Sequence, residues 1–104
     1  MEEFQKVYIQ KMGSRIEALL AAQQRLNANF EESATSIRRL AHTLRGSGAT
    51  YGFPEISKLA AAAEDAGDVE LPKTLAQLIE HLQSLYDDHR PDRERILVVD
   101  DSEE

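Results

Sequence analysis

The sequence predicts an all-α fold, an antiparallel up-and-down four-helix bundle that leaves room for a short extra N-terminal helix. Apolar residues recur every three or four positions along most of the chain, and runs of β-branched residues are scarce before Ile96. The breaks between the periodic stretches are short, so consecutive helices should be antiparallel neighbours. A chain of 104 residues can bury one core. We therefore expect one bundle domain over residues 1–89.

The first periodic stretch covers residues 2–26 and has one apolar face. That face comprises Phe4, Val7, Tyr8, Met12, Ile16, Leu19, Gln23 and Leu26. Gly13 interrupts the stretch, and Ser14 followed by Glu17 has the form of a capping box. The stretch is therefore either one kinked helix or a short helix followed by a longer one, and we expect two segments.

The second helix should begin at Asn29, because Asn29 followed three residues later by Glu32 is typical of an N-cap. Its apolar stripe comprises Ile37, Leu40, Ala41, Leu44 and Gly48. We expect it to end near Tyr51 and Gly52, since Ala49, Thr50 and Tyr51 continue the helical pattern.

Two further helices complete the predicted bundle. Pro54 suits the first turn of a third helix that stops at Gly67 and Asp68. The core face of that helix comprises Ile56, Leu59, Ala60, Ala63 and Ala66. The fourth helix opens near Pro72 and ends at Arg90 and Pro91. Its stripe comprises Leu75, Leu78, Ile79, Leu82, Leu85 and Tyr86.

Composition excludes several classes of function. Twelve Lys and Arg against 19 Asp and Glu give a net charge of −7, which disfavours nucleic acid as a partner. The chain has no apolar run of the roughly 20 residues that a membrane span requires, and its acidic start is unlike a secretion signal. It lacks cysteine, and therefore disulfides and thiolate metal sites. No glycine-rich phosphate loop is present, so we expect no autonomous kinase activity.

His42 is the strongest candidate for chemistry. At 100° per residue it points roughly 140° away from the apolar stripe of its helix, towards solvent. Arg45 and Gly46 follow one turn later on the same surface. Gly46 and Gly48 both lower helix stability, which indicates a need for close approach. Neutral imidazole is a good nucleophile near pH 7, and Arg45 could balance an added negative charge, so the group fits transient capture of a phosphoryl group.

Residues 41–53 resemble the signature of histidine-containing phosphotransfer (HPt) domains, including the phosphorylatable N-terminal domain of chemotaxis histidine kinases. The shared pattern is a histidine, a base three residues on, a glycine four on, a small residue five on and a glycine ten on. The resemblance extends over about residues 16–86. It implies a helical bundle, phosphorylation of His42 on Nε2, exchange with an aspartate of a receiver domain, a histidine kinase as a further partner and a cytoplasmic location. Arg45 departs from the usual lysine.

Glu64 is a second candidate, reached by geometry. From His42 the second helix runs about 12 Å to its end, and the third runs about 15 Å back from Pro54 to Glu64. The carboxylate should therefore lie beside the imidazole, where accepting a hydrogen bond from Nδ1 would leave Nε2 free to attack. The spacing also resembles that of a glutamate in the chemotaxis kinases. Alternatively, Glu64 is a surface acid that solvates the end of its helix beside Asp65.

The surface around His42 should bind the partner. We assign Arg38, Arg39, Gly46, Ser47 and Ala49 to it, although the two arginines could equally serve only to solvate their helix. His81 and His89 lack companions at metal-ligand spacing, so we expect no metal site. A non-phosphorylated helical interaction module in a signalling protein is the alternative function.

The C-terminal segment carries a separate resemblance. After a polar linker at 90–95, residues 96–104 resemble the first strand and acidic pair of a response-regulator receiver domain. In such a domain, Asp100 and Asp101 would bind Mg²⁺. The chain ends before a sheet could form, so the segment implies a piece of a larger two-component signalling protein. We expect no cofactor in this chain and Mg²⁺ in the partner receiver.

Overall fold

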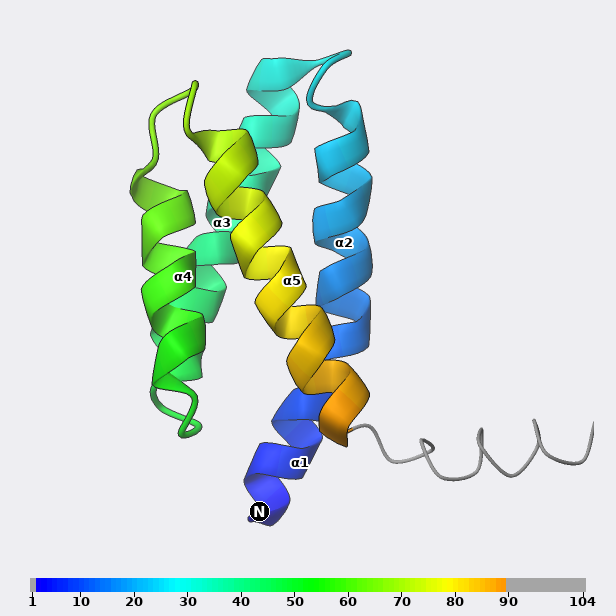
Figure 1. The fold of residues 1–104 in the computed structure, drawn as a ribbon, viewed down its shortest axis with the longest axis vertical. Coiled ribbons are helices and arrows are strands. Elements are labelled where there is room, and N and C mark those ends of the chain that lie inside the picture. The colour runs from blue at the N-terminus through cyan, green and yellow to red at the C-terminus, as the bar shows by residue number, and fades with distance from the viewer. Residues whose placement is uncertain (1, 90–104) are drawn as a thin grey trace, which may run out of the picture.

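A computed structural model describes residues 2–89, and these form an all-helical bundle. The helices are α1 (Glu3–Gln10), α2 (Met12–Arg25), α3 (Phe30–Gly48), α4 (Pro54–Asp65) and α5 (Leu71–His89). Successive helices from α2 to α5 run antiparallel, and each packs on the next in a ring that α5 closes against α2 (Figure 1). Helix α1 extends past the end of α2, beneath the bundle (Figure 1). No strand occurs among residues 2–89, and the predicted four-helix bundle is confirmed.

The core is built from the apolar stripes of the four bundle helices α2 to α5, with Tyr8 and Ile9 added from α1. Its largest fully buried side chains are Ile9, Met12, Leu19, Ile37, Leu44, Ile56, Leu71, Leu75, Leu78 and Leu82. Helix α4 contributes mostly small residues, with Ala60 and Ala63 fully buried. Small side chains let helix axes approach closely, and α3 and α4 use this freedom.

The first periodic stretch divides into two helices, as expected, but the break lies at Lys11 rather than at Gly13. Lys11 ends α1 and precedes α2. The predicted capping box of Ser14 and Glu17 is wrong, because the Ser14 hydroxyl donates to the Lys11 carbonyl at 3.2 Å. Gly13 has a packing role instead. A Cβ there would lie 3.1 Å from the Tyr86 hydroxyl, so the glycine permits α2 to approach α5.

Helix α1 packs against the end of α3 and the turn that follows it. The Tyr8 ring stacks on Tyr51 with centroids 4.5 Å apart, and its hydroxyl pairs with the Ser47 Oγ at 2.7 Å. The placement of Phe4 and Val7 on the core face is wrong, since they are 52% and 41% exposed. Because α1 extends beyond the bundle, only one side of it meets other helices. That side carries Tyr8 and Ile9.

Both ends of α3 follow from local sequence. At its start, Asn29 Oδ1 accepts a hydrogen bond from the Glu32 amide at 3.4 Å, which confirms the expected N-cap. Regular helix ends at Gly48, earlier than expected, but turn hydrogen bonds continue to Phe53. The Phe53 amide bonds to the Gly48 carbonyl, the Gly52 amide bonds to the Ala49 carbonyl, and Gly52 has a φ of +89°. This is a Schellman motif, in which the left-handed position favours glycine.

A serine hydroxyl fixes α4 against the end of α3. Ser57 Oγ accepts a hydrogen bond from the Ala49 amide and donates one to the Arg45 carbonyl, both at 2.7 Å. It thus bridges the amide and the carbonyl that a helical hydrogen bond would otherwise join, close to the end of α3. A Cβ at Gly48 would lie 2.8 Å from the Ser57 backbone nitrogen. The two helices are therefore in near backbone contact, which sets the register between His42 and Glu64.

Candidate functional site

His42 projects from the outer face of α3 and pairs with a carboxylate on α4. Its side chain is 73% exposed, and its Nδ1 lies 2.7 Å from Glu64 Oε2. An ionised carboxylate can only accept hydrogen bonds, so Nδ1 must carry the proton of this pair. In the neutral ring the lone pair then belongs to Nε2, the nitrogen suited to nucleophilic attack.

Glu64 also binds the guanidinium of Arg45. Its Oε1 accepts a hydrogen bond from Arg45 Nη1 at 3.1 Å, so one carboxylate joins the imidazole and the cation. The hydrogen bond from Arg45 is the main reason that the pKa of Glu64 lies below its ordinary value of 4.5. Desolvation opposes that decrease, and the hydrogen bond from His42 adds to it. Glu64 is therefore ionised at neutral pH, as its pairing with His42 requires.

Arg45 lies between two carboxylates. Besides its 3.1 Å contact with Glu64, Nη1 is 3.7 Å from Asp65 Oδ1. The contact with Asp65 was not anticipated from the sequence. The position of Asp65 directly after Glu64 could have indicated this contact. The spacing alone does not show that the Arg45 side chain leans towards α4.

The two interior glycines of α3 serve different purposes. Gly48 is required by α4, as described above. By contrast, a Cβ at Gly46 would meet nothing within 4 Å, and the residue is exposed one turn from His42. Ala49 is exposed further along the same helix. The fold itself therefore gives no reason for a glycine at position 46.

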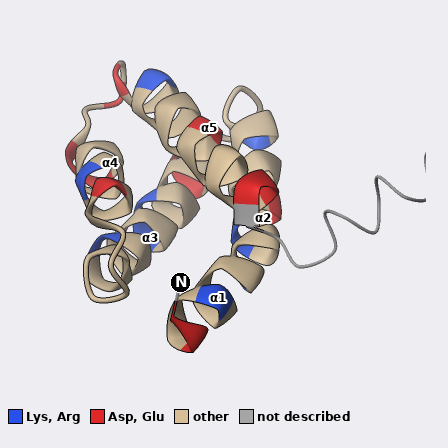
Figure 2. Ribbon diagram, turned by 60° about the horizontal axis from the view of Figure 1, so that its bottom comes forward, with Lys and Arg blue, Asp and Glu red and all other residues tan. Residues whose placement is uncertain are grey.

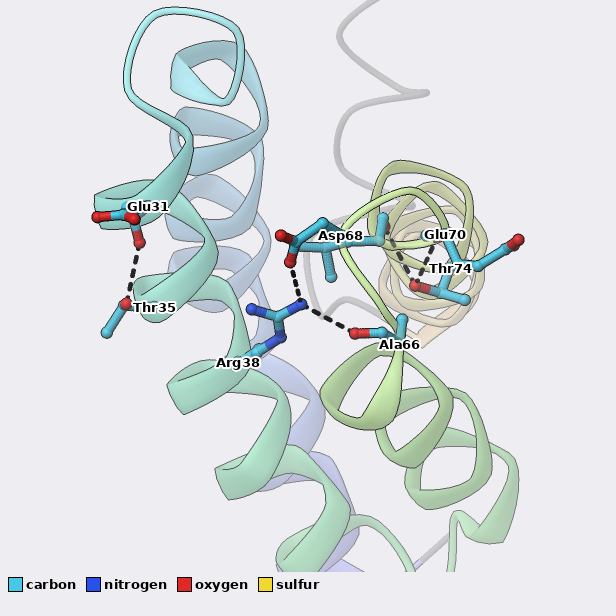
Figure 3. Close-up of polar contacts among 8 residues, drawn as sticks. Glu31, Thr35, Arg38, Ala66, Asp68, Glu70 and Thr74 are labelled. Atoms are coloured by element: carbon cyan, nitrogen blue, oxygen red, sulfur yellow. Dashed lines mark hydrogen bonds and ion pairs between the residues drawn. The ribbon is translucent and has the colours of Figure 1, made fainter.

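The basic residues before His42 have different surroundings. Figure 2 shows basic positions along α3 and acidic ones in the connection from α4 to α5. Arg38 points into that connection, where its Nη2 donates to the Ala66 carbonyl at 2.8 Å and lies 3.4 Å from Asp68 Oδ1 (Figure 3). Arg39 is exposed and lines an open cleft between α2 and α3. Arg38 thus caps the last turn of α4, and Arg39 is presented to solvent.

The structure brings together only part of the predicted site. His42, Arg45 and Glu64 form one hydrogen-bonded group, with Gly46 and Arg39 on the neighbouring surface. Ser47 faces α1 instead, through its hydrogen bond to Tyr8.

Outside this group, the described residues show few other candidates for chemistry. Within residues 2–89 no group of three or more His, Cys, Asp or Glu side chains could hold a metal ion. His81 is partly buried on α5, and His89 is the last residue of that helix. Over the same residues, no helix has both the length and the apolar character needed to cross a bilayer.

Comparison with known proteins gives one match. The family described as the Hpt domain matches residues 3–91, which include every helix of the bundle. No match was found among curated proteins or solved structures. The family match, the four-helix bundle and the exposed His42 agree with one another. The chain belongs to the Hpt domain family, the histidine phosphotransfer modules of two-component phosphorelays.

Proposed function

We propose that this protein accepts a phosphoryl group on Nε2 of His42 and exchanges it with an aspartate of a receiver domain. The observation that carries the proposal is the 2.7 Å contact between His42 Nδ1 and Glu64 Oε2. It fixes the tautomer in which Nε2 has its lone pair, on a side chain that is 73% exposed. A partner domain can therefore reach the nucleophile without any opening of the fold.

The transfer step requires no proton to leave the imidazole. The Nε2 lone pair forms the N–P bond as the P–O bond to the receiver carboxylate breaks, and that electron pair remains on the carboxylate oxygen. The ring keeps its Nδ1 proton and becomes cationic. The Glu64 carboxylate then stabilises the cation that it already contacts, as a carboxylate does beside other catalytic histidines.

Positioning and electrostatics supply the remaining catalysis. Phosphoryl transfer depends mainly on alignment and on stabilisation of negative charge, so a single histidine on a rigid helix is sufficient. Arg45 is one turn from His42 and can contribute its charge to the transferred group. We propose that Mg²⁺ comes with the receiver. The donor would be a histidine kinase or a phosphorylated receiver.

The partner should dock over the outer face of α3. Reacting atoms must approach within about 3 to 3.5 Å, which requires a surface without protruding side chains beside His42. Gly46 provides that surface, and Arg39 offers an exposed cation to an acidic partner. Ala49 extends the same face, whereas Arg38 and Ser47 hold α3 to the rest of the fold.

Incubation with a phosphorylated receiver and Mg²⁺ tests the proposal. We expect acid-labile, base-stable phosphate on the wild-type chain and none on His42→Gln. His81→Gln is the matched control, because it removes a histidine on α5 and should be labelled like the wild type. If wild type and His42→Gln stay equally unlabelled across several donors, the chain is a non-phosphorylated interaction module instead.

The C-terminal segment lies outside the described residues. The expectation that residues 90–95 form a linker and that residues 96–104 begin a receiver domain therefore stays a proposal from sequence. A longer protein with a receiver after the bundle would hold a phosphate acceptor on the same chain as His42.

A further inference from the structure

The ion pairs of Arg45 suggest a control on the phosphorylated state, an inference that rests on the proposed function. Arg45 Nη1 contacts both Glu64 and Asp65, at 3.1 and 3.7 Å. Glu64 has a second partner in His42. Among the described residues Asp65 has no ion pair other than the one with Arg45, although its side chain is 70% exposed.

Phosphorylation of His42 would change the electrostatic attraction between these side chains. The phosphorylated ring is cationic, so it attracts Glu64 more strongly than the neutral ring does. With the cationic ring as a partner, Glu64 depends less on Arg45 to balance its negative charge. The new phosphoryl group carries negative charge and attracts Arg45 itself. Asp65 gains no new partner, and it is therefore the carboxylate that opposes the movement of Arg45.

We propose that Asp65 is a positioning residue that holds Arg45 against α4 in the unphosphorylated protein and releases it to the phosphoryl group of phosphorylated His42. Asp65 touches neither the phosphorus nor the imidazole in this account. It acts through Arg45, by competing for one guanidinium. Its charge therefore shifts the distribution of phosphoryl groups between His42 and the receiver towards the receiver.

The expected effect is modest, because the pair is exposed and longer than an ideal ion pair. Exposed pairs of this kind change equilibria by about twofold to fivefold. Asp65→Asn removes the competing charge with little change in shape. We expect it to shift the equilibrium of phosphoryl exchange towards phosphorylated His42 by about that factor, in a bundle that remains folded and loses at most about 1 kcal/mol of stability, the energy of a roughly fivefold change.

A double-mutant cycle separates this mechanism from a general effect of charge. The phosphoryl distribution between a receiver and the chain is measured at equilibrium for wild type, Asp65→Asn, Arg45→Gln and the double variant. We expect Asp65→Asn to have no effect in the Arg45→Gln background. Glu80→Gln removes the same charge from the exposed side of α5 and should leave the equilibrium at the wild-type value.

The side-chain NMR signal of Arg45 gives a second measurement that needs no phosphate. We expect its Nε–H resonance to move in unphosphorylated Asp65→Asn, and to move in wild type on phosphorylation. A shift of equilibrium that persists without Arg45 would show that Asp65 acts only as nearby charge. Normal labelling of every variant with no shift in Asp65→Asn overturns this inference alone. Absence of any label on wild type overturns the proposed function as well.

Discussion

At the scale of single residues, Glu64 links the imidazole to the rest of the site. One oxygen holds the Nδ1 proton of His42, and the other holds Arg45. The first contact selects the nucleophilic nitrogen and later stabilises the cationic ring. The second lowers the pKa of the carboxyl, so that the acceptor stays ionised. Loss of Glu64 should therefore impair chemistry more than folding.

Glu64→Ala should slow phosphorylation of His42 by about ten- to hundredfold, the cost of removing a residue that orients a metal-binding histidine. Glu64→Gln should lose less, because its amide oxygen still accepts a hydrogen bond from Nδ1–H but does not neutralise the cationic ring. Rates of transfer from a phosphorylated receiver, with circular dichroism of each variant, measure this. If Glu64→Ala folds and transfers at the wild-type rate, Glu64 is only a surface acid.

The lowered pKa of Glu64 also predicts a pH dependence of stability. A carboxyl whose pKa is lower in the folded than in the unfolded state stabilises the fold above its ordinary value of 4.5. That stabilisation is lost as the pH falls below 4.5 towards the folded pKa. The melting temperature of wild type should therefore exceed that of Glu64→Gln at pH 6, and the difference should shrink as the pH falls below 4.5. A difference that stays constant across this range contradicts the assignment.

At the scale of elements, α3 carries the chemistry on one face and the packing on the other. The serine hydroxyl of Ser57 and the absent side chain of Gly48 bring α4 close. Gly46, two residues earlier, faces open space. The same residue type thus has a structural role at one position and, by our account, a docking role at the other.

Substitutions at the two glycines should separate these roles. Gly46→Gln should leave the bundle folded and up to about 1 kcal/mol more stable, because glycine is a poor helix former. Transfer from a phosphorylated receiver should nevertheless fall sharply, while labelling by acetyl phosphate changes less. Thermal melts and transfer rates measure both effects. Wild-type transfer by a folded Gly46→Gln protein would show that this surface does not dock the partner.

Gly48→Ala should have the opposite profile. Its Cβ would lie 2.8 Å from the Ser57 backbone nitrogen, which cannot move without shifting α4. We expect a loss of about 1–3 kcal/mol in the free energy of unfolding, as for other overpacked sites. Urea unfolding measures it. Unchanged stability would mean that α3 and α4 are not in near backbone contact.

The sequence was a good guide to the bundle helices and a poorer one to α1. Asn29 and Pro54 mark helix starts through local capping chemistry, which needs no knowledge of the rest of the fold. The core placement of Phe4 failed because helical period shows which residues share a face but not how far the neighbouring helices extend. Gly13 was misread for a similar reason, since its role depends on Tyr86 in a distant helix.

At the scale of the whole molecule, the bundle is a rigid support for one exposed histidine. Among residues 2–89, the buried apolar side chains lie between Tyr8 and Leu82, and they come from every helix. The site draws on two of those helices, so its geometry depends on how α3 and α4 pack. Glu64 could be located from the sequence because the rise per residue along α3 and α4 places it at the same level of the bundle as His42. The contact between Arg45 and Asp65 could not be predicted in this way, because the direction of a long side chain depends on the charged groups around it in the folded protein.

Removal of residues 92–104 should leave the bundle intact. In our proposal from the sequence, that segment belongs to the linker and to a following receiver domain, whereas the core of residues 2–89 is supplied by the five helices. Changes away from packed features usually alter stability by less than about 0.5 kcal/mol, so the melting temperature should shift by less than about 4 °C. Transfer to His42 should continue at the wild-type rate. A large loss of stability would show that the segment belongs to the bundle rather than to a following domain.

The most direct test of the central claim is to identify which nitrogen carries the phosphoryl group. Long-range ¹H–¹⁵N and ³¹P NMR spectra of the protein, phosphorylated by a receiver, distinguish the two ring nitrogens of each histidine. We predict a single phosphohistidine, at His42, with phosphorus on Nε2 and a proton retained on Nδ1 through its hydrogen bond to Glu64. Phosphorus on Nδ1 of His42, or on His81 or His89, would contradict it.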